Sequence, residues 1–300
     1  MLAAGLVASR FIHFAAVLTL FGVSLFPLYA GTGARAPGAW MRTAMVWASV
    51  LALLSGLGWF VFTTASMAGS LAGVTDPATL KSVVLETAFG PLWLARLALA
   101  IILVLLTTAS GRRTWPGWLV PALAGLLAAS LAGTGHAQLG EGWAGLFHVG
   151  ADGAHLIAAG FWIGGLAALG PVIAAMNRAD AAPPDLGRIL HRFSGVGYVA
   201  VAVLVASGLA NSLFLVASPR ALIATLYGRL LIAKVALFLA MACLALANRF
   251  WITPRLDQSE SPDRVWLRRL GRQVALEQGL GIAVIAIVSL LGTLEPAVGD

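Results

Sequence analysis

The histidines are the residues of this sequence best suited to chemistry. The chain has five: His13, His136, His148, His155 and His191. Imidazole binds copper, zinc and haem iron, and because it titrates near neutral pH it also transfers protons. His148, Asp152 and His155 are spaced so that a helix would carry all three on one face. We therefore predict a metal- or proton-binding site built around this face.

Other side chains within or beside apolar segments could complete such a site. Met67 would add a thioether suited to Cu(I), although ordinary apolar packing explains it as well. Polar groups inside a bilayer are costly and are retained mainly where they function. On this ground we expect four charged residues to support the site or handle protons: Asp152, Glu295, Arg96 and Lys234. For the two cations, snorkelling toward lipid headgroups is the alternative.

The composition predicts the elements that must position these residues. Hydrophobic residues make up 60% of the 300 residues and charged residues only 10%, against about 25% in a soluble domain. Apolar runs of roughly 20 residues are typical of membrane-spanning helices. We expect an all-α polytopic membrane protein that forms one integral membrane domain over residues 1–300. Its spans are predicted at about 6–29, 42–66, 91–110, 116–134, 147–175, 194–217, 228–250 and 273–293.

The basic residues predict the orientation of the chain. The net charge is +7, but no basic patch is interleaved with exposed polar surface, so we expect no nucleic-acid partner. Arginines concentrate in the connections after the odd-numbered spans, above all in residues 249–272. By the positive-inside rule these connections are cytoplasmic, which places both termini and every histidine except His191 on the outer side. In a bacterial inner membrane that side is the periplasm.

Several classes of activity are disfavoured by the sequence. A single cysteine, Cys243, excludes an internal disulfide and CxxC metal motifs. We find no nucleophile–base motif, phosphate-binding loop or ATP-hydrolysing domain, so we expect no enzyme. Any transport would be passive or coupled to a gradient.

The two halves of the sequence resemble each other in four places taken in the same order. RFIHFAAVLTLFG (10–22) is similar to DGAHLIAAGFWIG (152–164), so His13 aligns with His155. Three further matches align Ser55 with Ser207, Arg96 with Lys234, and His136 with Glu295. We predict two four-helix repeats, residues 1–137 and 143–300. Because each has an even number of spans, the repeats would be parallel, and parallel repeats commonly hold a site between them.

Longer segments resemble the copper resistance protein D family of bacterial inner-membrane proteins. They include GHA (135–137), AHLIAAGFWIGGL (154–166), RFSGVGYVAVAVLVASGLAN (192–211), YGRLLIAKVALFLAMACLALANRFWITPRL (227–256) and VALEQGLGIAVIAIVSLLGTL (274–294). The resemblance implies eight spans and copper movement inward from the periplasm, with a separate periplasmic copper-binding protein of the C type as partner. It carries the family's histidines over to His13, His136 and His155. His148 is added because of its helical spacing from Asp152 and His155, and Met67 because of its predicted position at the outer end of the second span.

Three functions remain open at this point. The leading hypothesis is copper import, with copper captured on the outer side and passed between the repeats. In the inner half the sequence offers only soft candidates: Met41, Met45, Met176 and Met241. The alternatives are a haem b-binding redox protein, with His13 facing His155 as axial ligands, and a membrane copper chaperone for oxidase assembly.

Overall fold

The computed structural model of the chain describes residues 1–30, 38–109, 115–134, 142–178, 186–215, 218–257 and 264–296. Within these ranges every regular element is helical. The long elements are α1 (Leu2–Ala30), α2 (Ala39–Ala68), α4 (Phe89–Ala109), α5 (Leu119–Ser130), α6 (Gly142–Ala159), α7 (Gly165–Arg178), α8 (Leu186–Leu215), α10 (Leu226–Ala247) and α12 (Arg264–Leu291). The prediction of an all-helical polytopic membrane protein is confirmed.

Two of the long helices contain a π-helical turn. The segment Gly160–Gly164 joins α6 to α7, and Asn248–Ile252 joins α10 to the short α11 (Thr253–Asp257). Among the described residues, seven continuous helices are long and apolar enough to cross a membrane. The remaining predicted span is α5, which continues in a 3-10 turn over Leu131–Thr134. Together these two pieces are roughly 26 Å long at the usual helical rises, close to the thickness of a bilayer core.

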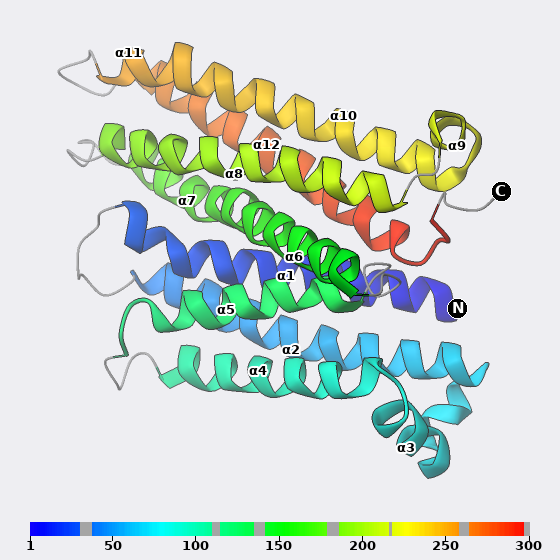
Figure 1. Cartoon of the computed structure of the whole chain (residues 1–300). Helices are drawn as coiled ribbons and strands as arrows, with labels where there is room; N and C mark the ends of the chain where they lie inside the picture. The colour runs from blue at the N-terminus through cyan, green and yellow to red at the C-terminus, as the bar shows by residue number, and fades with distance from the viewer. Residues whose placement is uncertain are drawn as a thin grey trace.

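The long helices run side by side, and the start of α1 and the end of α12 lie at the same end of the bundle (Figure 1). Helix α1 occupies the middle, where it packs against α2, α5, α7, α8 and α12. Its central side chains, including Val17 and Leu20, are completely buried. Helices α2 and α4 lie on one side of α1, and α8, α10 and α12 on the other.

Two glycines, Gly22 on α1 and Gly164 in the π turn after α6, let the backbones of these segments approach each other closely. A Cβ atom added at Gly164 would overlap the carbonyl oxygen of Leu18, and one added at Gly22 would overlap the backbone of Gly164. Small residues at such crossings let membrane helices approach closely. The GFWIG segment thus has the packing role that its glycine spacing indicates.

Two short helices precede α4 and α10 and end in the same kind of turn. They are α3 (Pro77–Leu85) and α9 (Pro219–Ala224), each with proline at its start. The hydroxyl of Thr87 accepts a hydrogen bond from the Gly90 N–H at 3.3 Å, and that of Thr225 accepts one from the Gly228 N–H at 2.9 Å. These contacts occur at positions that the two halves share in sequence. The division into repeats 1–137 and 143–300 nevertheless stays a proposal.

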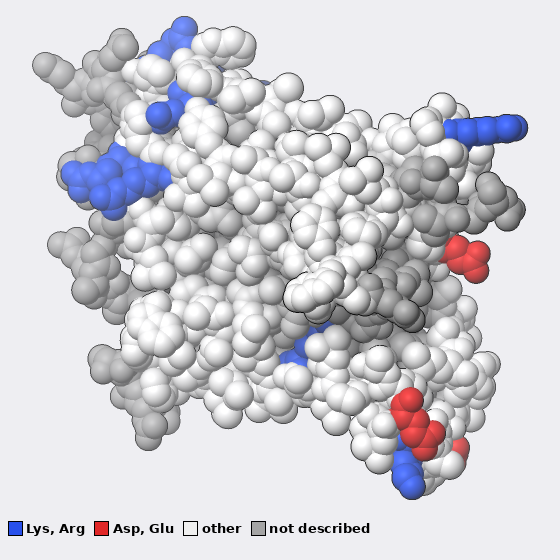
Figure 2. All heavy atoms as spheres, in the orientation of Figure 1, with Lys and Arg blue, Asp and Glu red and all other residues white. Residues whose placement is uncertain are grey.

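Charge is distributed unevenly along the bundle. Figure 2 shows a cluster of Lys and Arg side chains at the end where α8 and α12 begin and single ones elsewhere, whereas the Asp and Glu side chains visible in this view lie at the opposite end. The arginines at the first end include residues of α2, α8, the second π turn, α11 and α12: Arg42, Arg188, Arg192, Arg249, Arg255, Arg264, Arg268, Arg269 and Arg272. We call this the basic end of the bundle.

Candidate copper and proton site

A large cavity lies between α1, α6, α8, α10 and α12, toward the end opposite the basic end. Its volume is about 410 Å³. Most of its lining is apolar, as expected between membrane helices. The polar residues that line it are Arg10, His148, Asp152, His155, Asn211, Ser212, Tyr227 and Lys234. We call it the histidine cavity.

Helix α6 contributes the three residues whose spacing predicted a shared face, and all three line this cavity. The His148 ring is 4% exposed and stacks on Phe214, with ring centroids 4.5 Å apart and planes at 8°. One carboxylate oxygen of Asp152 accepts a hydrogen bond from Asn211 Nδ2 at 3.1 Å. The second half of the chain therefore places two imidazoles and one carboxylate around a single space.

The hydrogen bonds of Ser207 determine which nitrogen of His155 is free. The Ser207 hydroxyl donates to the Val203 carbonyl at 2.5 Å, so its oxygen is left to accept. His155 Nδ1 lies 2.9 Å from that oxygen and must donate its proton to it. Neutral His155 consequently keeps the lone pair on Nε2, the form in which a histidine ligates a metal.

His13 has a similar hydrogen bond but a different environment. Its Nδ1 lies 2.9 Å from the Ala52 carbonyl and 3.1 Å from the Ser55 hydroxyl. The ring is 2% exposed and lies against Trp59 and Trp93, at centroid distances of 5.6 and 6.1 Å. Its buried Nε2 has no partner among the described residues. His13 does not line the histidine cavity.

Two buried arginines flank this tryptophan-lined histidine. The Arg10 guanidinium lies 4.5 Å from the Trp59 ring centroid, and the Arg96 guanidinium lies 5.1 Å from that of Trp93. Arg96 Nε also donates to the Ser130 hydroxyl at 3.1 Å. Indole faces stabilise buried cations in this way. Two guanidinium groups nearby make the surroundings of His13 unfavourable for a metal cation.

The other candidate residues are scattered. Met67 is 55% exposed at the end of α2 and lines neither cavity, and Glu295 is exposed beyond the end of α12. Lys234 is half-buried and lines the histidine cavity with Asp152. His136 lies outside the described residues. Met241, which the sequence placed in the inner half, lines the histidine cavity instead.

Within the described ranges, no cluster of three His, Cys, Asp or Glu side chains is close enough to hold a metal ion. The histidine cavity therefore has the donor types for copper, but the described side chains do not form a closed coordination sphere. An open, partly assembled set of nitrogen and oxygen donors is compatible with transient binding of a cargo ion.

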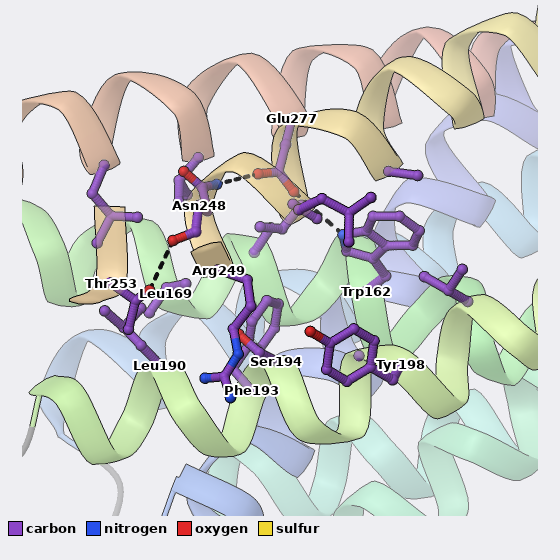
Figure 3. Close-up of a pocket in the computed structure, with 18 residues that line it drawn as sticks. Trp162, Leu169, Leu190, Phe193, Ser194, Tyr198, Asn248, Arg249, Thr253 and Glu277 are labelled. Atoms are coloured by element: carbon purple, nitrogen blue, oxygen red, sulfur yellow. Dashed lines mark hydrogen bonds between the residues drawn. The ribbon is translucent and has the colours of Figure 1, made fainter. Parts of the chain in front are cut away.

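Sequence reasoning missed Glu277, which lies in a second cavity of about 140 Å³ nearer the basic end (Figure 3). This side chain is 1% exposed and accepts hydrogen bonds from Asn248 and Trp162. The signal was present, because an acidic residue within a spanning helix indicates a functional site by default. In the sequence, Glu277 was considered only as part of residues 274–294, one of the segments that resemble the copper resistance protein D family. We call this space the Glu277 cavity.

Known proteins with similar sequences cover nearly the whole chain. Residues 1–146 match the family described as copper resistance protein D-like, N-terminal domain, and residues 187–291 match copper resistance protein D. Copper resistance protein D of Pseudomonas syringae pv. tomato is 32% identical over 97% of this chain and 96% of its own length. The chain belongs to the copper resistance protein D family.

Other relatives extend this family assignment. Inner membrane protein YebZ of Escherichia coli K12 is 32% identical over 99% of this chain and 100% of its own length. Copper transport protein CutJ of Bacillus subtilis 168 is 31% identical over 98% of this chain, which covers 54% of the relative. No solved structure matches the chain. As a copper resistance protein D family member, the chain is a copper-related membrane protein.

Proposed function

We propose that this protein carries copper across the bacterial inner membrane from the periplasm inward. The names of two relatives, a copper resistance protein and a copper transport protein, support copper as the substrate. The observation that carries the proposal is the histidine cavity, where His148, Asp152 and His155 line one space and His155 has Nε2 free. Imidazole nitrogen is a good ligand for copper in either oxidation state.

In this proposal His148 and His155 are the first copper ligands and Asp152 provides a balancing negative charge. His136 is a further ligand, and Met67 would receive copper at the membrane surface rather than in the cavity. His13 is assigned to packing, because Arg10 and Arg96 lie on the same tryptophans that enclose it. In this proposal His13 and His155, which the predicted repeats align, therefore have different roles: His155 binds copper and His13 does not.

The positive-inside rule supports the direction of entry. The basic end would face the cytoplasm, so the histidine cavity and both chain termini would lie on the periplasmic side. The name of the relative YebZ supports the inner membrane as the location. A separate periplasmic copper-binding protein of the C type would deliver the ion.

The first test combines metal analysis with a visible spectrum of the protein purified in detergent. We expect a colourless protein that retains copper, and we expect His155→Ala and His148→Ala each to lose it. The matched control is His191→Ala, which removes an exposed imidazole from the basic end. A Soret band with stoichiometric iron would instead establish the haem b alternative.

Transport is tested separately from binding. Protein in copper-free vesicles should accumulate copper, and His155→Ala should abolish the accumulation. Copper binding without accumulation would favour the copper-chaperone alternative, and full retention of copper by both His148→Ala and His155→Ala would contradict the proposed site.

A further inference from the structure

Glu277 is the most deeply buried acidic side chain among the described residues, and its position on α12 is enclosed by two irregular helix segments. Asn248 comes from the π turn after α10, and Trp162 comes from the π turn after α6. Such π turns are rare and are frequently found at functional sites. Both residues point toward Glu277 in the same cavity (Figure 3).

The two hydrogen bonds of Glu277 come from neutral groups. Asn248 Nδ2 donates to Oε1 at 2.6 Å, and Trp162 Nε1 donates to Oε2 at the long distance of 3.4 Å. Arg249 and Tyr198 are the charged or titratable neighbours that line this cavity. The Arg249 guanidinium, however, donates to His191 Nδ1 on α8 at 2.5 Å. Among the described residues, Glu277 has no ion-pair partner.

An ionised carboxylate in such surroundings lacks the charge partner that normally compensates its removal from water. Asn248 can form a hydrogen bond with Glu277 whether or not the Glu277 carboxyl group carries a proton. Its Nδ2 donates to a carboxylate, and its Oδ1, which is buried and has no partner among the described residues, would accept from a carboxyl O–H after the amide turns over. Glu277 can therefore gain or lose a proton while it stays hydrogen-bonded to Asn248.

The Glu277 cavity is next to the histidine cavity, because Trp162 lines both. The Trp162 ring also packs edge-on against Phe238, with centroids 5.8 Å apart, and Phe238 lines only the histidine cavity. The Trp162 side chain therefore borders both spaces and donates a hydrogen bond to the Glu277 carboxyl group. Gain or loss of a proton at Glu277 would change that hydrogen bond directly.

We propose that Glu277 is a reversible proton-binding site and that Trp162 links its protonation to the histidine cavity. If the protein transports copper as proposed above, Glu277 is the group that couples copper movement to a proton gradient; this part of the proposal rests on the proposed function. A proton suits the site better than copper does. Among the described residues that line this cavity there is no cysteine, methionine or histidine, whereas Cu(I) prefers sulfur and nitrogen ligands.

Infrared spectroscopy tests the proton site without using copper. At neutral pH the wild-type protein should show the C=O band of a protonated carboxyl group in an apolar setting, and raising the pH should remove it. Glu277→Gln should lack this band, because glutamine keeps the shape and the acceptor oxygen but has no carboxyl group. The matched control, Glu86→Gln, removes an exposed carboxyl group and should keep the band. A wild-type spectrum indistinguishable from that of Glu277→Gln would overturn the proposal.

Two further measurements separate the proposals. Copper added to the His148→Ala, His155→Ala double variant should leave the Glu277 band unchanged, and loss of the band would show a metal site and overturn the assignment to a proton. In vesicles, Glu277→Gln should remove the dependence of copper uptake on a pH gradient. If the gradient dependence survives this variant, coupling through Glu277 is wrong. If wild-type protein takes up no copper, the transport proposal fails while the infrared result still decides whether Glu277 binds a proton.

Discussion

The two histidines that the sequence aligned make similar hydrogen bonds but have different neighbours. His13 and His155 both place Nδ1 on a serine of the neighbouring helix, at 3.1 and 2.9 Å. Near His13, however, the first half has Arg10 stacked on Trp59, whereas the second half has Asp152 bonded to Asn211 at the aligned positions. The first half thus encloses its histidine among aromatic rings and two guanidinium groups, whereas the second leaves its histidine beside a cavity lined by Asp152 as well as by the cations Arg10 and Lys234.

The Ser207 hydroxyl should matter for copper binding although it touches no metal. Ser207→Ala removes the acceptor that fixes the proton of His155 on Nδ1, and loss of such partners typically weakens metal binding by about 10- to 100-fold. Copper titration of the purified variant measures the change. Ser212→Ala is the control, because this hydroxyl also lines the cavity but bonds only to the Gly208 carbonyl. Equal affinities for both variants would show that Ser207 does not orient the ligand.

At the scale of the helices, the close crossing of α1 with the π turn after α6 allows a direct test of packing. Gly164→Ala should destabilise the protein by about 1–3 kcal/mol, because the new methyl group would overlap the Leu18 carbonyl and overpacking is costly. Thermal unfolding in detergent provides the measurement.

The control for this crossing is Gly195→Ala on α8, where an added Cβ meets nothing within 4 Å. That change should be neutral or slightly stabilising, since alanine is the better helix former. If the two variants unfold at the same temperature, the close backbone approach at Gly164 does not contribute to stability.

At the scale of the whole molecule, the charge distribution predicts the orientation in the membrane. Alkaline phosphatase is active only in the periplasm, so a fusion after Asp300 should be active and a fusion after Arg255, at the basic end, should be inactive. A colony-level activity assay with matched expression compares them. The reverse pattern would place the histidine cavity on the cytoplasmic side and exclude copper entry from the periplasm.

The sequence by itself determined the class of protein and the approximate positions of its long helices. Long apolar runs with few charges have no other stable form in a bilayer, because every backbone group must be bonded within the chain. The shared face of His148, Asp152 and His155 was also predictable, since helical periodicity alone determines it. Similarity to a known family then indicated copper.

Only the tertiary structure decided which polar residues share a space. His13 and His155 look equivalent in sequence, but neighbouring helices enclose His13 between Trp59 and Trp93 and leave His155 beside a cavity. Glu277, Asn248 and Trp162 lie far apart along the chain and meet because α12 packs against both π turns. Periodicity specifies the face of a helix but not its neighbour, which depends on how the side chains of all the helices pack together.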